Sequence, residues 1–218
     1  MGARGAGGEA NQASRVSGGS AARADSGLAE LISARVRDIA DYPQPGIVFK
    51  DITPLLADGS AFAAVVAALA AGHGGEEGAK GREGGKGREG GQRRVSKVAG
   101  IEARGFIFAA PVALSLGAGF VPVRKQGKLP AATYAETYQL EYGTATIEVH
   151  TDAFEPGDRV LIVDDVLATG GTAAATASLI RRAGAEVAAI TVVLELGFLN
   201  ARSRLSGLEV RSLYLSGG

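Results

Sequence analysis

The fold follows from one stretch, Val160-Leu-Ile-Val-Asp-Asp-Val-Leu-Ala-Thr-Gly-Gly-Thr172. Its first four residues form an unbroken apolar run, which is typical of a parallel strand covered on both faces. Asp164 and Asp165 are therefore expected at the carboxyl end of this strand, the edge at which open α/β sheets bind ligands. From Ala168 to Thr172 small residues allow the backbone to approach an anion, and the helix that follows points its free N–H groups at that anion.

This arrangement predicts a ligand with a phosphate at one end and a sugar at the other. A monoester phosphate fits the glycine-containing loop, and the two carboxylates can accept hydrogen bonds from a pair of vicinal hydroxyls. Ribose 5-phosphate satisfies both requirements. The candidate residues for phosphate and ribose are Asp164, Asp165, Ala168, Thr169, Gly170, Gly171 and Thr172.

The stretch closely resembles the phosphoribosyl pyrophosphate (PRPP) motif of the type I phosphoribosyltransferases. Four further stretches resemble those of the family members that act on adenine, and the resemblance extends from about Leu28 to Leu215 with one insertion. These stretches are Pro45-Gly-Ile-Val-Phe-Lys-Asp-Ile-Thr-Pro54, Gly100-Ile-Glu-Ala-Arg-Gly-Phe106, Val123-Arg-Lys-Gln-Gly-Lys-Leu-Pro130 and Leu140-Glu-Tyr-Gly143.

The resemblance implies an α/β fold with a doubly wound, mainly parallel sheet, a small hood and a mobile catalytic loop. The implied activity is transfer of the 5-phosphoribosyl group of PRPP to adenine, giving AMP and pyrophosphate in purine salvage. It also implies Mg²⁺ bound mainly through PRPP, and a homodimer in which the partner lends a basic residue to the pyrophosphate. A hard ion that keeps waters and uses few protein carboxylates suits this role.

The same resemblance assigns roles to further residues. Glu141 and Tyr142 are expected at the tip of the catalytic loop, and they join Asp164 and Asp165 as catalytic candidates. Backbone groups of Val48 and Lys50 are expected to pair with adenine, although Lys50 stands where many relatives carry Arg. The pyrophosphate candidates are Arg104, Arg124, Lys125 and Lys128, and the adenine candidates are Val48, Phe49, Lys50 and Leu196.

Two rival functions share the phosphate loop. A transferase for another 6-substituted purine should lack the pairing of Val48-Phe49-Lys50 with Leu140-Glu-Tyr-Gly143. A regulator that senses PRPP without turnover would need an added nucleic-acid-binding module. Both rivals fit the sequence less well than an enzyme acting on adenine.

Composition limits the partners and the location. The 218 residues include 23 Lys and Arg and 23 Asp and Glu, so the formal net charge of zero favours neither nucleic acid nor an anionic membrane. The longest apolar run, residues 61–71, is much shorter than the roughly 20 residues that span a bilayer. The chain has no Cys, which is compatible with the expected cytoplasmic location.

Two segments are expected to lie outside the folded core. Residues 1–26 are mainly Gly, Ala, Ser and Arg with hardly any large apolar side chain, so they are predicted to be disordered. The phosphoribosyltransferase domain is then predicted over residues 27–218. Within it, residues 72–94 form a Gly- and charge-rich insert that contains a repeated hexapeptide and is predicted to be a flexible surface linker.

Hydrophobic periodicity predicts the remaining elements. A helix is expected from Leu28 to about Ile39, a loop over residues 49–54, and a second helix capped by Asp58 or Ser60. Further predictions are strands at 95–99, 120–123, 160–163 and 187–194, helices at 106–116 and 172–183, a polar unperiodic segment at 124–137, and an antiparallel hairpin around Gly143.

Overall fold

The structure is a computed structural model that describes residues 18–74, 94–139 and 143–217, with side chains described from residue 26. A seven-stranded sheet with the strand order β5-β6-β4-β3-β7-β8-β9 forms its centre, and a separate ribbon pairs β1 with β2. The elements are α1 (Gly18–Ser33), β1 (Arg37–Ile39), β2 (Phe49–Asp51), α2 (Thr53–Ala57), α3 (Gly59–Ala70), β3 (Lys97–Ile101), α4 (Arg104–Leu116), β4 (Gly119–Lys125), β5 (Thr133–Gln139), β6 (Thr144–His150), β7 (Arg159–Leu167), α5 (Gly171–Arg182), β8 (Glu186–Leu196), the 3₁₀ helices η1 (Gly197–Leu199) and η2 (Ala201–Leu205), and β9 (Val210–Ser216).

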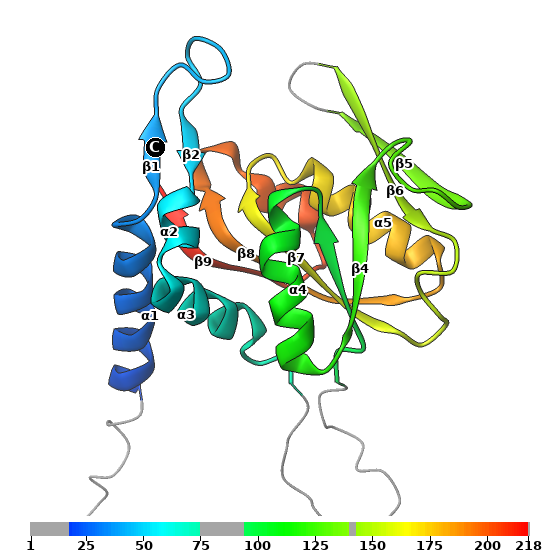
Figure 1. The fold of residues 1–218 in the computed structure, drawn as a ribbon, viewed down its shortest axis with the longest axis horizontal. Helices are drawn as coiled ribbons and strands as arrows, with labels where there is room; N and C mark the ends of the chain where they lie inside the picture. The colour runs from blue at the N-terminus through cyan, green and yellow to red at the C-terminus, as the bar shows by residue number, and fades with distance from the viewer. Residues whose placement is uncertain (1–17, 75–93, 140–142, 218) are drawn as a thin grey trace, which may run out of the picture.

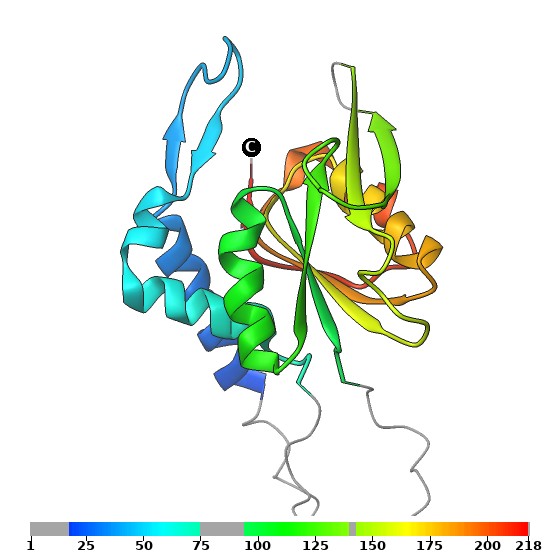
Figure 2. The same ribbon diagram turned by 45° about the vertical axis from the view of Figure 1, so that its right-hand side comes forward.

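The sheet is parallel from β4 through β3, β7 and β8 to β9, and antiparallel where β5 and β6 extend it beyond β4. Helices α1 to α4 lie on one face of the sheet and α5 lies on the other (Figure 1). The β1–β2 ribbon and the β5–β6 ribbon rise at the same end of the molecule, as Figure 2 shows. This arrangement confirms the predicted doubly wound, mainly parallel α/β sheet.

Strand β7, the middle one of the five parallel strands, shows why both faces of the sheet are covered. Successive strand side chains point to opposite faces. Val160 and Ile162 join the apolar cluster beneath α5, whereas Leu161 and Val163 join the cluster beneath α3 and α4. All four side chains are fully buried. Each face of the sheet therefore has its own apolar core, and the helices that cover the faces do not cover the ends of the strands.

The predicted N-terminal helix is wrong at both ends. α1 begins at Gly18, inside the extension that was expected to be disordered up to residue 26, while residues 1–17 lie outside the described residues. It ends at Ser33, and residues 37–39 form β1 instead of the last helical turn. Cross-strand ion pairs between Arg37 and Asp51 (2.7 Å) and between Lys50 and Asp38 (2.8 Å) stabilise the ribbon.

Three other expectations need correction. The predicted loop at 49–54 contains β2 and the start of α2. The predicted polar, unperiodic segment at 124–137 contains the first part of β5, which pairs along its whole length with β6. Strand β7 continues to Leu167 because β8 keeps pairing with it, although pairing with β3 stops at Val163. Asp164 and Asp165 therefore lie within β7, at the point where its neighbour β3 ends.

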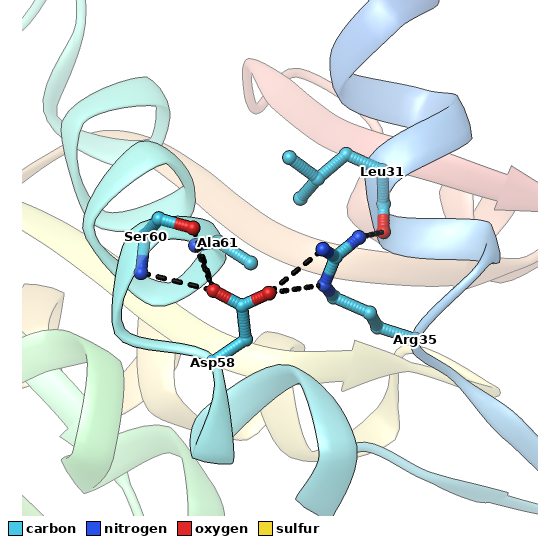
Figure 3. A network of polar contacts seen from close by, with 5 residues as sticks. All are labelled: Leu31, Arg35, Asp58, Ser60 and Ala61. Atoms are coloured by element: carbon cyan, nitrogen blue, oxygen red, sulfur yellow. Dashed lines mark hydrogen bonds and ion pairs between the residues drawn. The ribbon is translucent and has the colours of Figure 1, made fainter.

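Asp58 caps α3 as predicted, and it also joins this helix to the segment after α1 (Figure 3). Its Oδ1 accepts hydrogen bonds from the backbone N–H groups of Ser60 and Ala61, both at 3.0 Å. Its Oδ2 accepts from Arg35 Nε at 2.8 Å, and Arg35 also donates to the carbonyl oxygen of Leu31. One carboxylate thus fixes α3 against the end of α1.

Within the described ranges, the chain has no helix with the length and apolar character needed to cross a membrane.

Candidate active site

The loop between β7 and α5 has the backbone geometry of an anion-binding turn. Gly170 has a φ of 78°, and a Cβ added there would lie 2.8 Å from the carbonyl oxygen of Ala201, so the loop needs glycine at this position. Helix α5 then begins at Gly171 without a side-chain cap and without an acidic residue in its first turn. Its N-terminus is therefore suited to an anion supplied from outside the chain.

This loop lines a cavity of about 340 Å³. The predicted loop residues all contribute to the wall, together with apolar side chains from β7 and β8. The lining residues are Ile162, Asp164, Val166, Leu167, Ala168, Thr169, Gly170, Gly171, Thr172, Ala173, Ile190 and Val192. The structure therefore brings the phosphate-loop candidates together with Asp164.

A second cavity of about 270 Å³ shares Asp164, Val166, Ala168 and Thr172 with the first, so the two adjoin along one wall. Its other walls come from the β3–α4 turn and from β4, β5 and β6. Its lining residues are Ile101, Glu102, Ala103, Arg104, Lys125, Tyr138, Ile147, Asp164, Asp165, Val166, Ala168 and Thr172. Together the cavities form one elongated site along the carboxyl ends of β3 and β7.

The two aspartates are held close to the start of α4. The backbone N–H of Asp165 donates to Asp164 Oδ1 at 2.9 Å. A Cβ added to Gly105 would lie 2.7 Å from the same Oδ1 and 3.1 Å from the carbonyl oxygen of Val163, so glycine lets α4 approach β7 this closely. Asp165 is 4% exposed. The carboxylate pair is thus largely removed from bulk water while it still lines the site.

Arg104 connects this carboxylate pair to the β1–β2 ribbon. Its Nε lies 2.7 Å from Asp165 Oδ2, and its guanidinium lies 4.9 Å from the centre of the Phe49 ring. The Asp165 contact is an ion pair without hydrogen-bond directionality, so this buried oxygen has no hydrogen-bond partner among the described residues. Asp165 Oδ2 can therefore still accept a hydrogen bond from a ligand.

Burial and mutual repulsion change the acidity of the pair. Burial, followed by the charge of Asp165, raises the pKa of Asp164 well above its ordinary value of 3.8. Burial also raises the pKa of Asp165, whereas the charge of Arg104 acts in the opposite direction. Two buried carboxylates side by side favour retention of a proton, with Asp164 the stronger candidate to hold it.

The pyrophosphate candidates fall into two groups. Arg104 and Lys125 line the second cavity. Arg124 instead directs its Nε to Glu102 Oε2 at 3.2 Å and its Nη1 to the carbonyl oxygen of Lys128 at 2.9 Å. Lys128 is exposed and does not line either cavity. In this structure Arg124 therefore braces the loop, and Glu102 is a site residue that sequence reasoning missed.

The adenine candidates are only partly assembled. Phe49 lies beside Arg104, and its ring packs edge-on against Tyr42 at 5.2 Å between ring centres. Lys50 directs its ammonium group to Asp38, so its side chain is engaged across the ribbon. Val48 is 49% exposed. Leu196 ends β8 and pairs with Ser216 of β9.

Two sequence predictions lie outside the described residues, because Glu141 and Tyr142 fall in the gap at 140–142. Tyr138, which immediately precedes this segment, lines the second cavity and was missed. Its position next to the quoted Leu140-Glu-Tyr-Gly143 stretch was the available signal. Glu102 likewise stood inside the quoted Gly100–Phe106 stretch.

The described residues contain no cluster of three or more His, Cys, Asp or Glu side chains that could hold a metal ion. The site does offer two adjacent carboxylates, one with a buried oxygen that has no hydrogen-bond partner. This donor set suits Mg²⁺ that keeps most of its ligands from water and substrate phosphates.

The chain is similar to a known protein family and to several known sequences. Residues 56–206 match the model of the phosphoribosyl transferase domain. The chain is 59% identical over 179 residues to adenine phosphoribosyltransferase from Streptomyces coelicolor, covering 82% of this chain and 89% of the relative. It is 58% identical over 186 residues to the enzyme of the same name from Thermobifida fusca, covering 85% and 96% of the two chains.

Solved structures give the same result. The crystal structure of adenine phosphoribosyltransferase from Rhodothermus marinus matches with a TM-score of 0.76 and 46% identity, covering 88% of this chain and 99% of that one. The enzyme from Saccharomyces cerevisiae, complexed with adenine and an imino-altritol bisphosphate, matches with a TM-score of 0.74 and 33% identity. That match covers 86% of this chain and 99% of the yeast chain.

Proposed function

The chain belongs to the adenine phosphoribosyltransferase family, and we propose that its two adjoining cavities bind PRPP for reaction with adenine. The enzyme transfers the 5-phosphoribosyl group of PRPP to adenine, giving AMP and pyrophosphate in purine salvage. The observation that carries the site assignment is the shared wall of the cavities, where Asp164 lies between the phosphate loop and Arg104. No observation favours either rival function, the transferase for another 6-substituted purine or the regulator that senses PRPP without turnover.

The first cavity binds the 5-phosphate. Backbone N–H groups from Ala168 to Thr172 and the uncapped start of α5 donate to its oxygens, and the Thr169 and Thr172 hydroxyls add further donors. Asp164 and Asp165 accept hydrogen bonds from the ribose hydroxyls. Asp165 Oδ2 is ion-paired with Arg104 but has no hydrogen-bond partner among the described residues, which supports this role, because a sugar hydroxyl would donate to it.

The second cavity binds pyrophosphate. Arg104 and Lys125 provide positive charge at its wall, which supports their assignment. Arg124 and Lys128 remain proposed pyrophosphate ligands by family resemblance, although in this structure Arg124, near the end of β4, donates to the carbonyl oxygen of Lys128 in the loop that follows. A homodimer in which the partner lends a basic residue, and a cytoplasmic location, complete the proposal. Mg²⁺ held mainly by PRPP, next to Asp164 and Asp165, would neutralise the departing pyrophosphate.

Bond breaking at the ribose leaves positive charge on the sugar, as in glycoside cleavage. The carboxylates of Asp164 and Asp165 hold the sugar by its hydroxyls and lie close enough to oppose this charge. The Glu141 carboxylate exchanges a proton with the purine ring as the new bond forms, and the Tyr142 ring packs over the sugar. These two assignments rest on the family resemblance alone.

Adenine binds under the β1–β2 ribbon. Backbone groups of Val48 and Lys50 pair with its amino edge, and Phe49 and Leu196 contact its faces. The ion pair between Lys50 and Asp38 supports a backbone role for Lys50, because its ammonium group already has a partner. Replacement of the common Arg by Lys at this position is then tolerated.

The test compares three variants in a steady-state assay of AMP formation. Asp165→Asn and Glu141→Gln are expected to lower kcat by roughly 10²–10³-fold, as for removal of a group that stabilises transition-state charge. Asp152→Asn, which alters an exposed carboxylate, is the matched control and should retain the wild-type rate. Near-normal turnover by either of the first two variants would remove that residue from the mechanism.

A further inference from the structure

Tyr138 lies against the phosphate loop from a different part of the chain. It belongs to β5, whereas Thr172 is in the first turn of α5. The Thr172 hydroxyl donates a hydrogen bond to the Tyr138 hydroxyl at 3.0 Å. Gly171 makes the approach possible, because a Cβ added there would lie 3.0 Å from Tyr138 Cδ2 and 3.3 Å from the carbonyl oxygen of Gln139. Side chain and loop are therefore in direct contact.

The rest of the β5–β6 ribbon is fixed on α5 independently of this bond. The guanidinium of Arg182 lies 5.0 Å from the centre of the Tyr134 ring, and its Nη1 donates to the carbonyl oxygen of Ala135 at 3.2 Å. Tyr134 and Tyr138 are on the same face of β5 because they are four residues apart. The Tyr138 hydroxyl is thus held beside the phosphate loop by ribbon packing as well as by Thr172.

Tyr138 also separates two cavities. On one side it lines the second cavity of the active site, where its hydroxyl lies 3.0 Å from that of Thr172, a residue that lines both the second cavity and the first. On the other it lines an outer cavity of about 420 Å³, whose wall includes Glu136, Gln139, Gly171 and Arg204. Its ring therefore closes the side of the active site next to the phosphate loop.

We propose that Tyr138 is a phosphate-binding residue of the active site, which donates its hydroxyl proton to the 5-phosphate of PRPP alongside Thr172. This inference rests on the proposed phosphate site in the first cavity. A phenol that accepts a hydrogen bond from Thr172 keeps its own proton for another acceptor. A phosphate monoester that accepts a hydrogen bond from the Thr172 hydroxyl also brings other charged oxygens close to the Tyr138 hydroxyl. Hydrogen bonds to charged oxygens are stronger than those between neutral groups.

The position of Tyr138 predicts a specific kinetic pattern. The 5-phosphate does not change during the reaction, so a bond to it contributes equally to the bound substrate and to the transition state. Loss of such uniform binding raises KM and leaves kcat unchanged. Substitution of a residue that only supports the ribbon would not weaken binding of the 5-phosphate while leaving binding of pyrophosphate unchanged.

The experiment measures binding of ribose 5-phosphate and of inorganic pyrophosphate, each with Mg²⁺, by titration calorimetry. Tyr138→Phe keeps the ring against Gly171 and removes only the hydroxyl. It should weaken ribose 5-phosphate about tenfold or more and raise the KM for PRPP similarly, with kcat and pyrophosphate binding nearly unchanged. Tyr134→Phe, the same substitution on the same face of the ribbon, is the control and should match wild type.

Two results would overturn the inference: wild-type affinity of Tyr138→Phe for ribose 5-phosphate, or an equal loss for ribose 5-phosphate and pyrophosphate. Thermal unfolding of both variants checks that the ribbon is intact, and Thr172→Val gives a second measure of donation to the phosphate. Wild-type protein that does not bind ribose 5-phosphate would remove the proposed phosphate site itself. If wild type and Tyr138→Phe bind ribose 5-phosphate equally well, the role of Tyr138 is refuted and the proposed phosphate site remains.

Discussion

Arg104 Nε lies 2.7 Å from Asp165 Oδ2, so the first residue of α4 is ion-paired with a buried carboxylate of the neighbouring strand β7. The same guanidinium lies over the ring of Phe49. One side chain therefore contacts both the proposed ribose site and the proposed base site. Because Asp165 also neighbours Asp164, a change in charge at any of these groups is felt by the others.

This coupling predicts proton release when the sugar phosphate binds. Burial raises the pKa of both aspartates in the free protein, and hydroxyl donors from the ribose stabilise their charged forms. Binding therefore lowers these pKa values, and affinity for ribose 5-phosphate increases as pH rises through the raised values. Calorimetry in two buffers of different ionisation enthalpy measures the protons released.

The ligand phosphate itself titrates near pH ~6, so the comparison needs a variant. Asp165→Asn should release fewer protons than wild type with the same ligand at the same pH. Equal proton release by the two proteins would show that the aspartate pair does not bind the ribose hydroxyls.

Gly105→Ala tests the close approach of α4 to β7. Its Cβ would lie 2.7 Å from Asp164 Oδ1 and 3.1 Å from the carbonyl oxygen of Val163, so the backbone must shift. We expect a loss of about 1–3 kcal/mol in the free energy of unfolding, together with reduced AMP formation. Denaturant unfolding and steady-state kinetics on the same preparation measure both effects.

Gly59→Ala is the matched control, because it lies in the first turn of α3 and nothing lies within 4 Å of its added Cβ. It should stabilise the protein by about 0.5–1 kcal/mol through reduced backbone freedom in the unfolded chain, and leave kinetics unchanged. Full activity and stability in Gly105→Ala would mean that the start of α4 is not fixed by this contact.

Asp58 is predicted to contribute to stability without affecting catalysis. Hydrogen bonds from Ser60 and Ala61, and then the Arg35 guanidinium, hold its pKa well below the ordinary value of 3.8. A group with a lowered folded pKa stabilises the fold above its unfolded pKa, and this contribution is lost as pH falls toward the folded value. Asp58→Asn should therefore lower Tm at neutral pH, by an amount that shrinks in strong acid.

The measurement is thermal unfolding of wild type and Asp58→Asn across the acid range, with Asp152→Asn as the exposed control. Arg35→Gln should lower Tm in the same direction, since it removes the ion pair drawn in Figure 3. KM values should not change in any of these variants. A Tm difference that grows on acidification would contradict the assignment.

The insert is predicted to be dispensable. Its central residues, 75–93, lie outside the described residues, but both flanks meet the same residue at the end of α4. A Cβ on Gly74 would lie 3.9 Å from Leu116, and Arg94 Nη2 donates to the Leu116 carbonyl oxygen. Replacing residues 75–93 with a short Gly-Ser link should leave kcat and KM within about twofold. The fold should not be destabilised, because closing a shorter loop costs less entropy.

The location of these flanks supports that expectation. They precede the first residue of β3, at the amino end of the parallel strands, whereas the two cavities lie at the carboxyl ends. A deletion variant that folds and yet loses activity would show that the insert has a role in the reaction.

Sequence patterns predicted the centre of the fold well because its signals are local. The apolar run of β7, the small residues before α5 and the Asp58 cap each depend on neighbours within a few residues. The strand at Arg37–Ile39 was mistaken for helix because its partners, residues 49–51, are supplied by a distant segment. Strand β9 was not predicted, since it is an edge strand whose mostly half-buried residues give little periodic signal.

Local signals also explain which residues of the candidate site could be proposed from the sequence. The phosphate loop and the two aspartates are contiguous in sequence and were found together. Tyr138 and Glu102 reach the cavity from β5 and from the β3–α4 turn, and only the sheet order brings them there. The ion pair of Arg124 with Glu102 is likewise a tertiary contact that no local spacing reveals.

The most direct test is the initial rate of nucleotide formation from PRPP and Mg²⁺ with adenine, hypoxanthine, guanine and xanthine compared side by side. Membership in the adenine phosphoribosyltransferase family predicts rapid formation of AMP and pyrophosphate from adenine and no comparable rate with the other three bases. A comparable rate with another base, or PRPP binding without turnover of adenine, would contradict it.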